Sequence, residues 1–357
     1  MDDKLKKRIL DRKNEGTLRS LSINTLSVDF FTNDYLGFSK ENFDVTGSNQ
    51  GSTGSRLLSG NSVEATQCEK LLSEFYDSEA AVVFNSGYDA NIGVLSSVAQ
   101  RGDYILYDEC IHASTRDGIR LSFANAHSFK HNDSNDLKRH LKTLKGTIYI
   151  IVEALYSMDG DMAPLKRIGE LSQEYGAFLI VDEAHACGVY GSSGRGIIHA
   201  RSMQEQVFCR VVTFGKAYGF HGGAVLCSNE LREYLINFCR PFIYTTALPK
   251  ESYTSIMNRV NSGKIRERQI KLHENISRFR EELRKLEFLS EENSPIQVME
   301  FKTKASLLRL VDKLKQAGIH TKPIFPPTVP KGSCRLRLCL HSFNSIEEID
   351  LLVSCLK

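Results

Sequence analysis

Residues 212–218 read VTFGKAY, and they end an apolar, β-branched run on a lysine, Lys216, that lies among small residues. A lysine amine becomes a nucleophile when it is partly desolvated and its pKa falls, and a strand that ends at a cleft supplies that environment. Most lysines after a strand are simply solvated, so Lys216 needs partners before it indicates chemistry. Residues 179–183, LIVDE, supply one, because Asp182 closes a second buried run.

The runs that would form a sheet with these two stretches are short and lack alternating charges, as expected for strands buried on both faces. They are residues 80–84, 104–107, 147–153, 177–183, 207–214 and 223–227. Helical patterns lie between several of them, including residues 64–76 and residues 166–175. This alternation predicts an α/β fold with a mainly parallel sheet, helices on both faces and ligands at the carboxyl ends of the strands.

The two ends of the chain have a different character. Residues 2–13 carry apolar positions at helical spacing and predict a short amphipathic helix that packs on a partner subunit, and residues 29–37 begin as an apolar strand run. Beyond Pro249 a charged helix, an alternating strand at residues 335–340 and a capped last helix predict a small α+β domain. We therefore predict an N-terminal helix and arm (1–34), a large α/β domain (35–260) and a C-terminal α+β domain (261–357).

Composition narrows the class of protein. The 357 residues include 46 basic and 43 acidic ones, a net charge of +3, which argues against a dedicated nucleic-acid or membrane-surface binder. The N-terminus lacks the apolar core of a signal peptide, and no stretch approaches the roughly 18 apolar residues of a membrane span, so we expect a cytoplasmic protein. The nine cysteines are scattered without a C-x-x-C pair, which indicates neither a disulfide framework nor a metal site.

Two short motif matches do not carry a function. Residues 182–185 spell DEAH, the acidic box of a helicase, but that box requires a phosphate loop of the form G-x-x-x-x-G-K-[ST], and Lys216 is followed by Ala217. Residues 191–196 have the glycine order G-x-x-G-x-G, which is wrong for a dinucleotide-binding loop. We therefore reject an ATPase or a dinucleotide-binding protein.

The remaining residues share one chemical logic, that of pyridoxal 5′-phosphate (PLP). Asp182 could hold the proton on the pyridine nitrogen that makes the ring an electron sink, and Lys216 could close the Schiff base. The candidates for the rest of the site are His185 for the phenolic oxygen, His112 for stacking on the ring, and Ser86, Gly87, Tyr88 and Thr213 for the phosphate at a helix N-terminus. Each is ambiguous alone; the ordered set at successive strand ends is much less so.

Longer motifs along nearly the whole chain resemble those of the α-oxoamine synthases. They are NDYLG (33–37), GSTGSRLLSGN (51–61), HND (131–133), YSMDGD (156–161), VDEAH (181–185), TFGK (213–216) and PPTVP (326–330). The resemblance implies a fold-type I PLP-dependent transferase with a mainly parallel seven-stranded sheet. It also implies a homodimer with its active sites at the subunit interface.

Carried over position by position, the resemblance implies the following roles. Lys216 is the Schiff-base lysine, Asp182 faces the pyridine nitrogen, His112 stacks, His185 and Ser157 lie near the phenolic oxygen, Thr213 with the Gly87 and Tyr88 backbone holds phosphate, Thr245 or Thr246 reaches in from the second subunit, and Arg337, Asn33 and Thr328 contact substrate. The sequence departs from the family at Ala186-Cys187 and at the Phe220-His221 pair. The family's N-terminal arginine has two candidates, Arg12 and Arg19.

The implied reaction is the decarboxylative condensation of an amino acid with an acyl thioester. The motifs at residues 51–61, 131–133 and 326–338 favour L-alanine and a pimeloyl thioester, as in biotin biosynthesis, with coenzyme A or an acyl carrier protein as the carrier. Relatives that use glycine or serine share most of these residues. A noncatalytic subunit on the same fold is the alternative of a different class, and the intact set of Lys216, Asp182 and His112 argues against it.

Overall fold

The computed structural model describes residues 3–16, 18, 26–41, 43, 51–326, 329 and 332–357. A seven-stranded sheet forms its centre, with the strand order β2-β8-β7-β6-β5-β3-β4. The strands are β2 (Ala80–Phe84), β3 (Tyr104–Asp108), β4 (Asn125–Phe129), β5 (Ile148–Glu153), β6 (Phe178–Asp182), β7 (Cys209–Thr213) and β8 (Gly223–Cys227). Neighbouring strands from β4 to β7 run parallel, and β8 runs antiparallel to both β7 and β2. The predicted mainly parallel sheet is confirmed.

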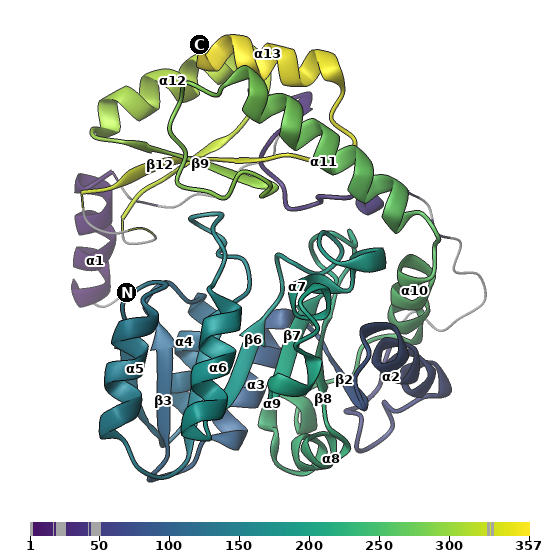
Figure 1. The fold of residues 1–357 in the computed structure, drawn as a ribbon. Coiled ribbons are helices and arrows are strands. Elements are labelled where there is room, and N and C mark those ends of the chain that lie inside the picture. The colour runs from purple at the N-terminus through teal and green to yellow at the C-terminus, as the bar shows by residue number, and fades with distance from the viewer. Residues whose placement is uncertain are drawn as a thin grey trace.

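Helices cover both faces of this sheet (Figure 1). They are α2 (Val63–Tyr76), α3 (Gly87–Val98), α4 (Ala113–Leu121), α5 (Ser134–Thr143), α6 (Leu165–Tyr175), α7 (Gly196–Ala200), α8 (Asn229–Phe238), α9 (Arg240–Ile243) and α10 (Lys250–Val260). Each face has its own core: Val94 of α3 packs with Val211 on one side, and Ile168 of α6 packs with Val181 on the other. Alternate residues of a strand point to opposite faces, so apolar runs such as CRVVT fill both cores.

The strand β4 has no counterpart among the runs that the sequence predicts. Its residues, NAHSF, are mostly polar, and four of the five remain at least partly exposed. It lies at the edge of the sheet and pairs only with β3 among the described strands. An edge strand has little apolar surface to bury, so its sequence carries no strong strand signal.

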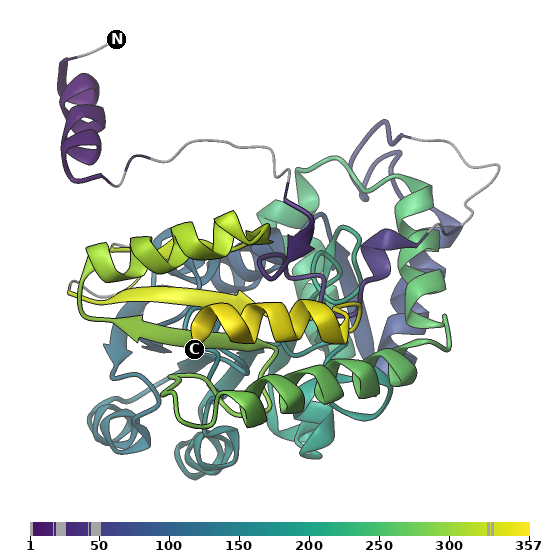
Figure 2. The same ribbon diagram turned by 90° about the horizontal axis from the view of Figure 1, so that it is seen from above.

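The C-terminal domain packs above the carboxyl ends of the parallel strands (Figures 1 and 2). It has an antiparallel sheet in the order β11-β12-β9, covered by helices. Its elements are α11 (Ile265–Glu282), β9 (Ile296–Phe301), α12 (Lys304–Gln316), β10 (Ile319–His320), β11 (Lys322–Ile324), β12 (Cys334–Cys339) and α13 (Ile346–Leu356). The capping box that opens α13 is confirmed, because the Ser345 hydroxyl accepts the Glu348 N–H at 3.2 Å and the Glu348 carboxylate accepts the Ser345 N–H at 3.2 Å.

The N-terminal segment behaves partly as predicted. Helix α1 (Asp3–Asn14) forms, stands apart from the body of the ribbon (Figure 2), and contacts α12 where Lys304 Nζ donates to the Gly16 carbonyl at 3.3 Å. The strand expected over residues 29–37 is wrong beyond its first residue, because β1 covers only Val28–Asp29 and pairs with β10. The Asp29 carboxylate accepts the N–H of Phe31 at 2.9 Å, a local turn that competes with the sheet ladder.

Four shorter observations complete the fold. The 3₁₀ turns are η1 (Phe38–Lys40), η2 (Ser192–Gly194) and η3 (Gln204–Gln206). All nine cysteines are free, and seven of them are buried. Within the described parts of the chain, no helix combines the length and the apolarity that crossing a bilayer requires. The boundaries at residues 34 and 260 stay predictions, and the pairing of β1 with β10 joins the N-terminal arm to the C-terminal domain.

Candidate active site

The candidate site lies where three neighbouring strands of the large sheet end. Glu153 of β5 is in register with Asp182 of β6, and Asp182 is in register with Val211 of β7, two residues before Thr213 ends that strand. Lys216 follows three residues after Thr213. Because parallel strands present their carboxyl ends on one edge, side chains that are far apart in sequence gather here.

Lys216 and Asp182 form the electrostatic centre of the site. Burial lowers the pKa of Lys216, and the positive charge of Arg337 adds to that lowering, whereas Asp182 and Glu153 favour the ammonium form. Asp182 is buried, its Oδ1 accepts the Ala184 N–H at 2.8 Å, and its other oxygen is bound from α3. An amine with a depressed pKa beside a buried carboxylate is the arrangement that a Schiff-base lysine and a pyridinium partner require.

Sequence reasoning missed the residue that holds Asp182, which is Asn91 on α3. Asn91 Nδ2 donates to Asp182 Oδ2 at 2.7 Å and lies 3.1 Å from Ser114 Oγ. Ser114 Oγ in turn lies 2.8 Å from His112 Nδ1, and His112 forms the N-cap of α4. One chain of hydrogen bonds therefore links the two residues predicted to contact the ring. Asn91 sits in an ordinary amphipathic helix, and nothing in the local pattern sets it apart.

Glu153 was also missed as a site residue, although a signal was present. It ends the apolar run of residues 147–153 just as Asp182 ends its own run. Burial raises the pKa of Glu153 far above the ordinary range, and the charge of Asp182 raises it further; the backbone N–H groups of His112 and Ser157 act in the opposite direction. One carboxyl oxygen, Oε1, is buried without a hydrogen-bond partner. A protonated carboxylic acid is therefore the stable form at neutral pH.

His185 connects the strand ends to the N-terminal arm. The pKa of His185 lies well below its ordinary value because the ring is buried, and the charges of Lys216 and Arg337 add to that effect. Its Nδ1 lies 2.8 Å from the Tyr35 hydroxyl, which donates to Asn33 Oδ1 at 3.2 Å. A neutral, hydrogen-bonded imidazole is thereby fixed near Lys216. Tyr35 is a second residue that sequence reasoning did not single out.

Arg337 reaches this group from the C-terminal domain. It is buried on β12, its Nη2 donates to Asn33 Oδ1 at 2.9 Å, and its Nε donates to the Ser157 carbonyl oxygen at 2.7 Å. Its Nη1 lies 3.0 Å from Cys339 Sγ. The predicted pair of Arg337 and Asn33 therefore meets in the fold, and Ser157 meets it through its backbone.

The predicted phosphate site has the expected geometry at the start of α3. Ser86 is the N-cap, and its hydroxyl accepts the Asp89 N–H at 3.0 Å. A Cβ at Gly87 would lie 3.3 Å from the Thr213 side chain, so the threonine stands against the helix N-terminus. The unpaired N–H groups of a first helical turn and the helix dipole favour an anion at this place.

The remaining predicted residues lie around this site or outside the described chain. The Tyr88 hydroxyl points to α4, where it donates to Asp117. Thr245 Oγ1 accepts from Asn85 Nδ2 of its own chain at 3.1 Å, and the carbonyl of Thr246 accepts from the same amide at 3.0 Å. Thr328 and Arg19 fall outside the described residues, and Arg12 lies in α1.

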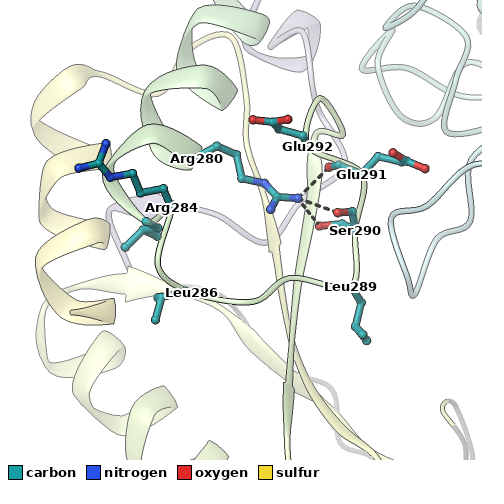
Figure 3. Close-up of a pocket in the computed structure, with 8 residues that line it drawn as sticks. Arg280, Arg284, Leu286, Leu289, Ser290, Glu291 and Glu292 are labelled. Carbon is teal, nitrogen blue, oxygen red and sulfur yellow. Dashed lines mark hydrogen bonds between the residues drawn. The ribbon is translucent and has the colours of Figure 1, made fainter.

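Two other features have structural explanations. The second carboxylate of the DEAH motif, Glu183, is fully buried and accepts from Arg210 Nε at 2.7 Å and from the Ile198 N–H at 3.0 Å. A pocket of about 380 Å³ lies at the end of α11 (Figure 3), and there Arg280 donates to the Ser290 carbonyl at 2.7 Å. Neither feature contains a predicted cofactor ligand, and both bind the chain to itself.

Comparison with known proteins gives this geometry a family. The model of the class I and II aminotransferases matches residues 27–355. The chain belongs to that family. An 8-amino-7-oxononanoate synthase from Emericella nidulans is 38% identical, over 98% of this chain and 94% of the relative. The class I and II aminotransferases are PLP enzymes, so this chain is a PLP-dependent transferase, as predicted.

Two solved structures agree with the predicted resemblance to the α-oxoamine synthases. A serine palmitoyltransferase from S. paucimobilis, solved with PLP bound, has a TM-score of 0.87 at 27% identity over 99% of this chain and 96% of that one. An 8-amino-7-oxononanoate synthase from Francisella tularensis has a TM-score of 0.78 at 30% identity over 93% and 97%. The fold-type I architecture is confirmed.

The residues present fit the cofactor of the family. The depressed pKa of Lys216, the buried carboxylate of Asp182 opposite it, and the cradle between Gly87 and Thr213 supply an amine, a proton partner and an anion site in one place. These are the three features by which a protein binds and tunes PLP.

Proposed function

We propose that the protein condenses L-alanine with a pimeloyl thioester, with loss of carbon dioxide, to form 8-amino-7-oxononanoate in the cytoplasm. The observation that carries the proposal is the position of Arg337, a buried cation that the C-terminal domain presents beside Lys216 and Asp182. A fixed guanidinium can bind the carboxylate of an amino acid in two-point geometry. The similarity to 8-amino-7-oxononanoate synthases supports the choice of alanine and a pimeloyl thioester.

The protein residues would divide the chemistry as follows. PLP, when bound, supplies an electron sink for the bond that breaks at the amino acid's α-carbon. Asp182 would keep the proton on the pyridine nitrogen, because its Oδ2 is held by Asn91 and its charge is buried. Lys216, displaced by the substrate amine, would take the α-proton as a general base, and its depressed pKa suits that role at neutral pH.

Three further residues would orient the reactants. His112, exposed at the N-terminus of α4 with its Nδ1 tied to Ser114, would cover one face of the ring. His185, neutral and tied to Tyr35, would face the phenolic oxygen. Arg337 would set the rotation about the bond between nitrogen and α-carbon by binding the carboxylate, which determines the bond that lies perpendicular to the ring and breaks.

We further propose that the active enzyme is a homodimer. The Gly54 carbonyl accepts the Ala247 N–H at 3.0 Å, which joins the glycine-rich loop to the segment beside Asn85 at the phosphate site. Large apolar side chains of these two segments are exposed, with Leu58 at 82% and Tyr244 at 71%. Cover by a second copy would bury them next to the site. The acyl carrier, coenzyme A or an acyl carrier protein, stays open.

The test is a substrate comparison on the purified PLP-loaded protein. L-Alanine, glycine and L-serine are titrated in turn while the visible spectrum is recorded, and each is then offered with pimeloyl-coenzyme A, pimeloyl-acyl carrier protein or palmitoyl-coenzyme A. Mass spectrometry of the product decides. We expect the mass of 8-amino-7-oxononanoate from alanine and a pimeloyl thioester, and Lys216→Ala should form none while retaining PLP. No condensation product with any pair would overturn the proposal.

A second candidate follows from the structural comparison. The TM-score to serine palmitoyltransferase, 0.87, exceeds the 0.78 to the solved 8-amino-7-oxononanoate synthase. Sequence identity points the other way, with 38% to the Emericella nidulans synthase against 27% to that palmitoyltransferase. A product from serine and palmitoyl-coenzyme A alone would establish the second candidate in place of the first.

A further inference from the structure

The loop that follows β5 carries the contacts through which the C-terminal domain meets the large domain beside the candidate site. We call residues 156–162 the docking loop. Arg337 Nε donates to the Ser157 carbonyl at 2.7 Å, and Arg335 Nη1 donates to the Met158 carbonyl at 3.1 Å and pairs with the Asp159 carboxylate at 2.5 Å. The conformation of the docking loop therefore determines where the Arg337 guanidinium lies.

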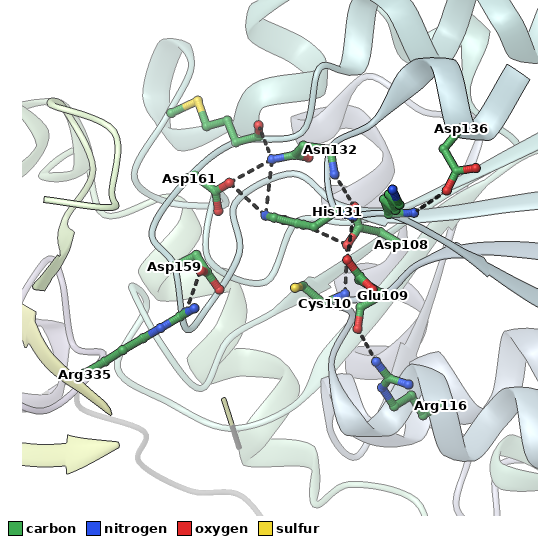
Figure 4. Close-up of polar contacts among 12 residues, drawn as sticks. Asp108, Glu109, Cys110, Arg116, His131, Asn132, Asp136, Asp159, Asp161 and Arg335 are labelled. Atoms are coloured by element: carbon green, nitrogen blue, oxygen red, sulfur yellow. Dashed lines mark hydrogen bonds and ion pairs between the residues drawn. The ribbon is translucent and has the colours of Figure 1, made fainter. Parts of the chain in front are cut away.

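Two residues that follow β4 hold the docking loop from the other side (Figure 4). His131 Nε2 lies 2.9 Å from Asp161 Oδ2, and Asn132 Nδ2 donates to the same oxygen at 2.8 Å. His131 Nδ1 lies 2.8 Å from Asp108 Oδ1, and the Asn132 N–H donates to Asp108 Oδ2 at 2.8 Å. Asp108 ends β3 and is fully buried. The docking loop is thereby bound to the ends of β3 and β4.

Packing and backbone geometry reinforce this connection. The Tyr156 ring meets the His131 ring edge-on with centroids 4.5 Å apart, and the Tyr156 N–H donates to the Asp161 carbonyl at 2.9 Å, which closes the loop on itself. Asn132 has φ = 56°, a left-handed conformation that asparagine tolerates better than most residues. That conformation lets both its N–H and its side chain point at carboxylates.

His131 bridges the two carboxylates as a cation. Both ring nitrogens face carboxylate oxygens, so both must donate. Burial opposes the charge, but the hydrogen bonds to Asp108 and Asp161 outweigh it and raise the pKa of His131 to about 12. Cys110 lies close enough to Asp108 and His131 for the three to hold a metal ion. Because both imidazole nitrogens are already bound to carboxylates, the ion-pair network accounts for the cluster without a metal.

We propose that His131 and Asn132 are positioning residues for the amino-acid substrate, because they fix the docking loop and through Ser157 orient Arg337. The inference rests on the proposed role of Arg337 as the carboxylate-binding residue. Neither residue contacts the Lys216 and Asp182 pair in the hydrogen bonds and ion pairs described here. Their loss should therefore weaken substrate binding while the cofactor stays in place.

The experiment compares His131→Gln and Asn132→Ala with a matched control, His127→Gln. His127 is an exposed histidine on β4, four residues before His131. PLP affinity, the visible spectrum, and KM and kcat for the amino acid are measured for each protein. We expect KM to rise at least about tenfold, equivalent to about 1.4 kcal/mol of binding, in both test variants. PLP affinity should be unchanged, kcat should change by less than about threefold, and His127→Gln should match the wild type.

Two outcomes would overturn the inference. One is a wild-type KM in folded variants, and the other is a loss of PLP affinity as large as the loss of substrate affinity, which would indicate general disruption. If His131→Gln does not fold, Asp161→Asn provides the same test, because it removes the loop's charge and keeps its size. If the wild type itself responds to no amino acid, the proposed function fails; if it responds and the variants respond equally, only this inference fails.

Discussion

The Lys216 amine is the residue on which the chemistry depends, and its charge reflects opposing influences. Burial lowers its pKa below the ordinary 10.5, while Asp182 raises it. The neutral, reactive amine therefore predominates from a lower pH than in an ordinary lysine. We predict that the rate of PLP attachment to apoprotein rises with a midpoint below pH 10.5, and that Asp182→Asn moves the midpoint further down. Stopped-flow absorbance across a pH series measures both; a midpoint that moves upward in the variant would contradict the assignment.

Asn91 provides a second prediction at this scale, because it is the side chain that binds Asp182 Oδ2. Removing the amide leaves a buried carboxylate oxygen without that donor, at a cost of roughly 1–3 kcal/mol. For Asn91→Ala we expect PLP affinity to fall by about tenfold, measured by fluorescence quenching, since a misplaced Asp182 holds the pyridine nitrogen less well. Ser97→Ala on the same helix, where the hydroxyl bonds only to backbone, is the control. Equal affinities in the two variants would remove Asn91 from the site.

At the scale of elements, the ends of β3 and β4 and the docking loop are joined by one charged histidine. The pKa of His131 rises from 6.5 unfolded to about 12 folded, so its stabilisation is fully present below pH 6.5 and is lost as the pH rises toward 12. We predict that the difference in unfolding free energy between the wild type and His131→Gln is largest near pH 6 and shrinks steadily by pH 9. Urea titrations at each pH test this. A difference that grows with pH would mean that the ring is neutral in the folded protein.

At the scale of the whole molecule, the site depends on two domains and, in the proposal, on two copies of the chain. Leu58 stands on the glycine-rich loop with 82% of its surface exposed. If a second copy covers it, a charge there should break the dimer. We predict that the wild type sediments at twice the 40.2 kDa chain mass and that Leu58→Asp shifts it toward the monomer with loss of PLP affinity. Ile270→Asp, at an exposed position of α11, should leave the mass unchanged. A monomeric wild type would reject the homodimer.

The sequence by itself determined the sheet and the chemical type of the site. Buried β-branched runs identify parallel strands because such strands lose contact with water on both faces, and residues that end those runs, such as Lys216 and Asp182, must then meet at one edge. Edge strand β4 escaped, because a strand with little apolar surface leaves no pattern. The turn after Asp29 escaped for the opposite reason, since a side chain displaced the strand ladder.

Only the tertiary structure decided which distant side chains hold the reacting ones. Asn91 is separated from Asp182 by 91 positions and Asn33 from Arg337 by 304, and no local pattern records such pairs. Glu153 could be placed at a strand end from its sequence, but its protonation follows from burial beside Asp182, which requires the sheet to be assembled. Periodicity reports which face of an element is buried; hydrogen bonds and pKa values depend on what the other elements bring to that face.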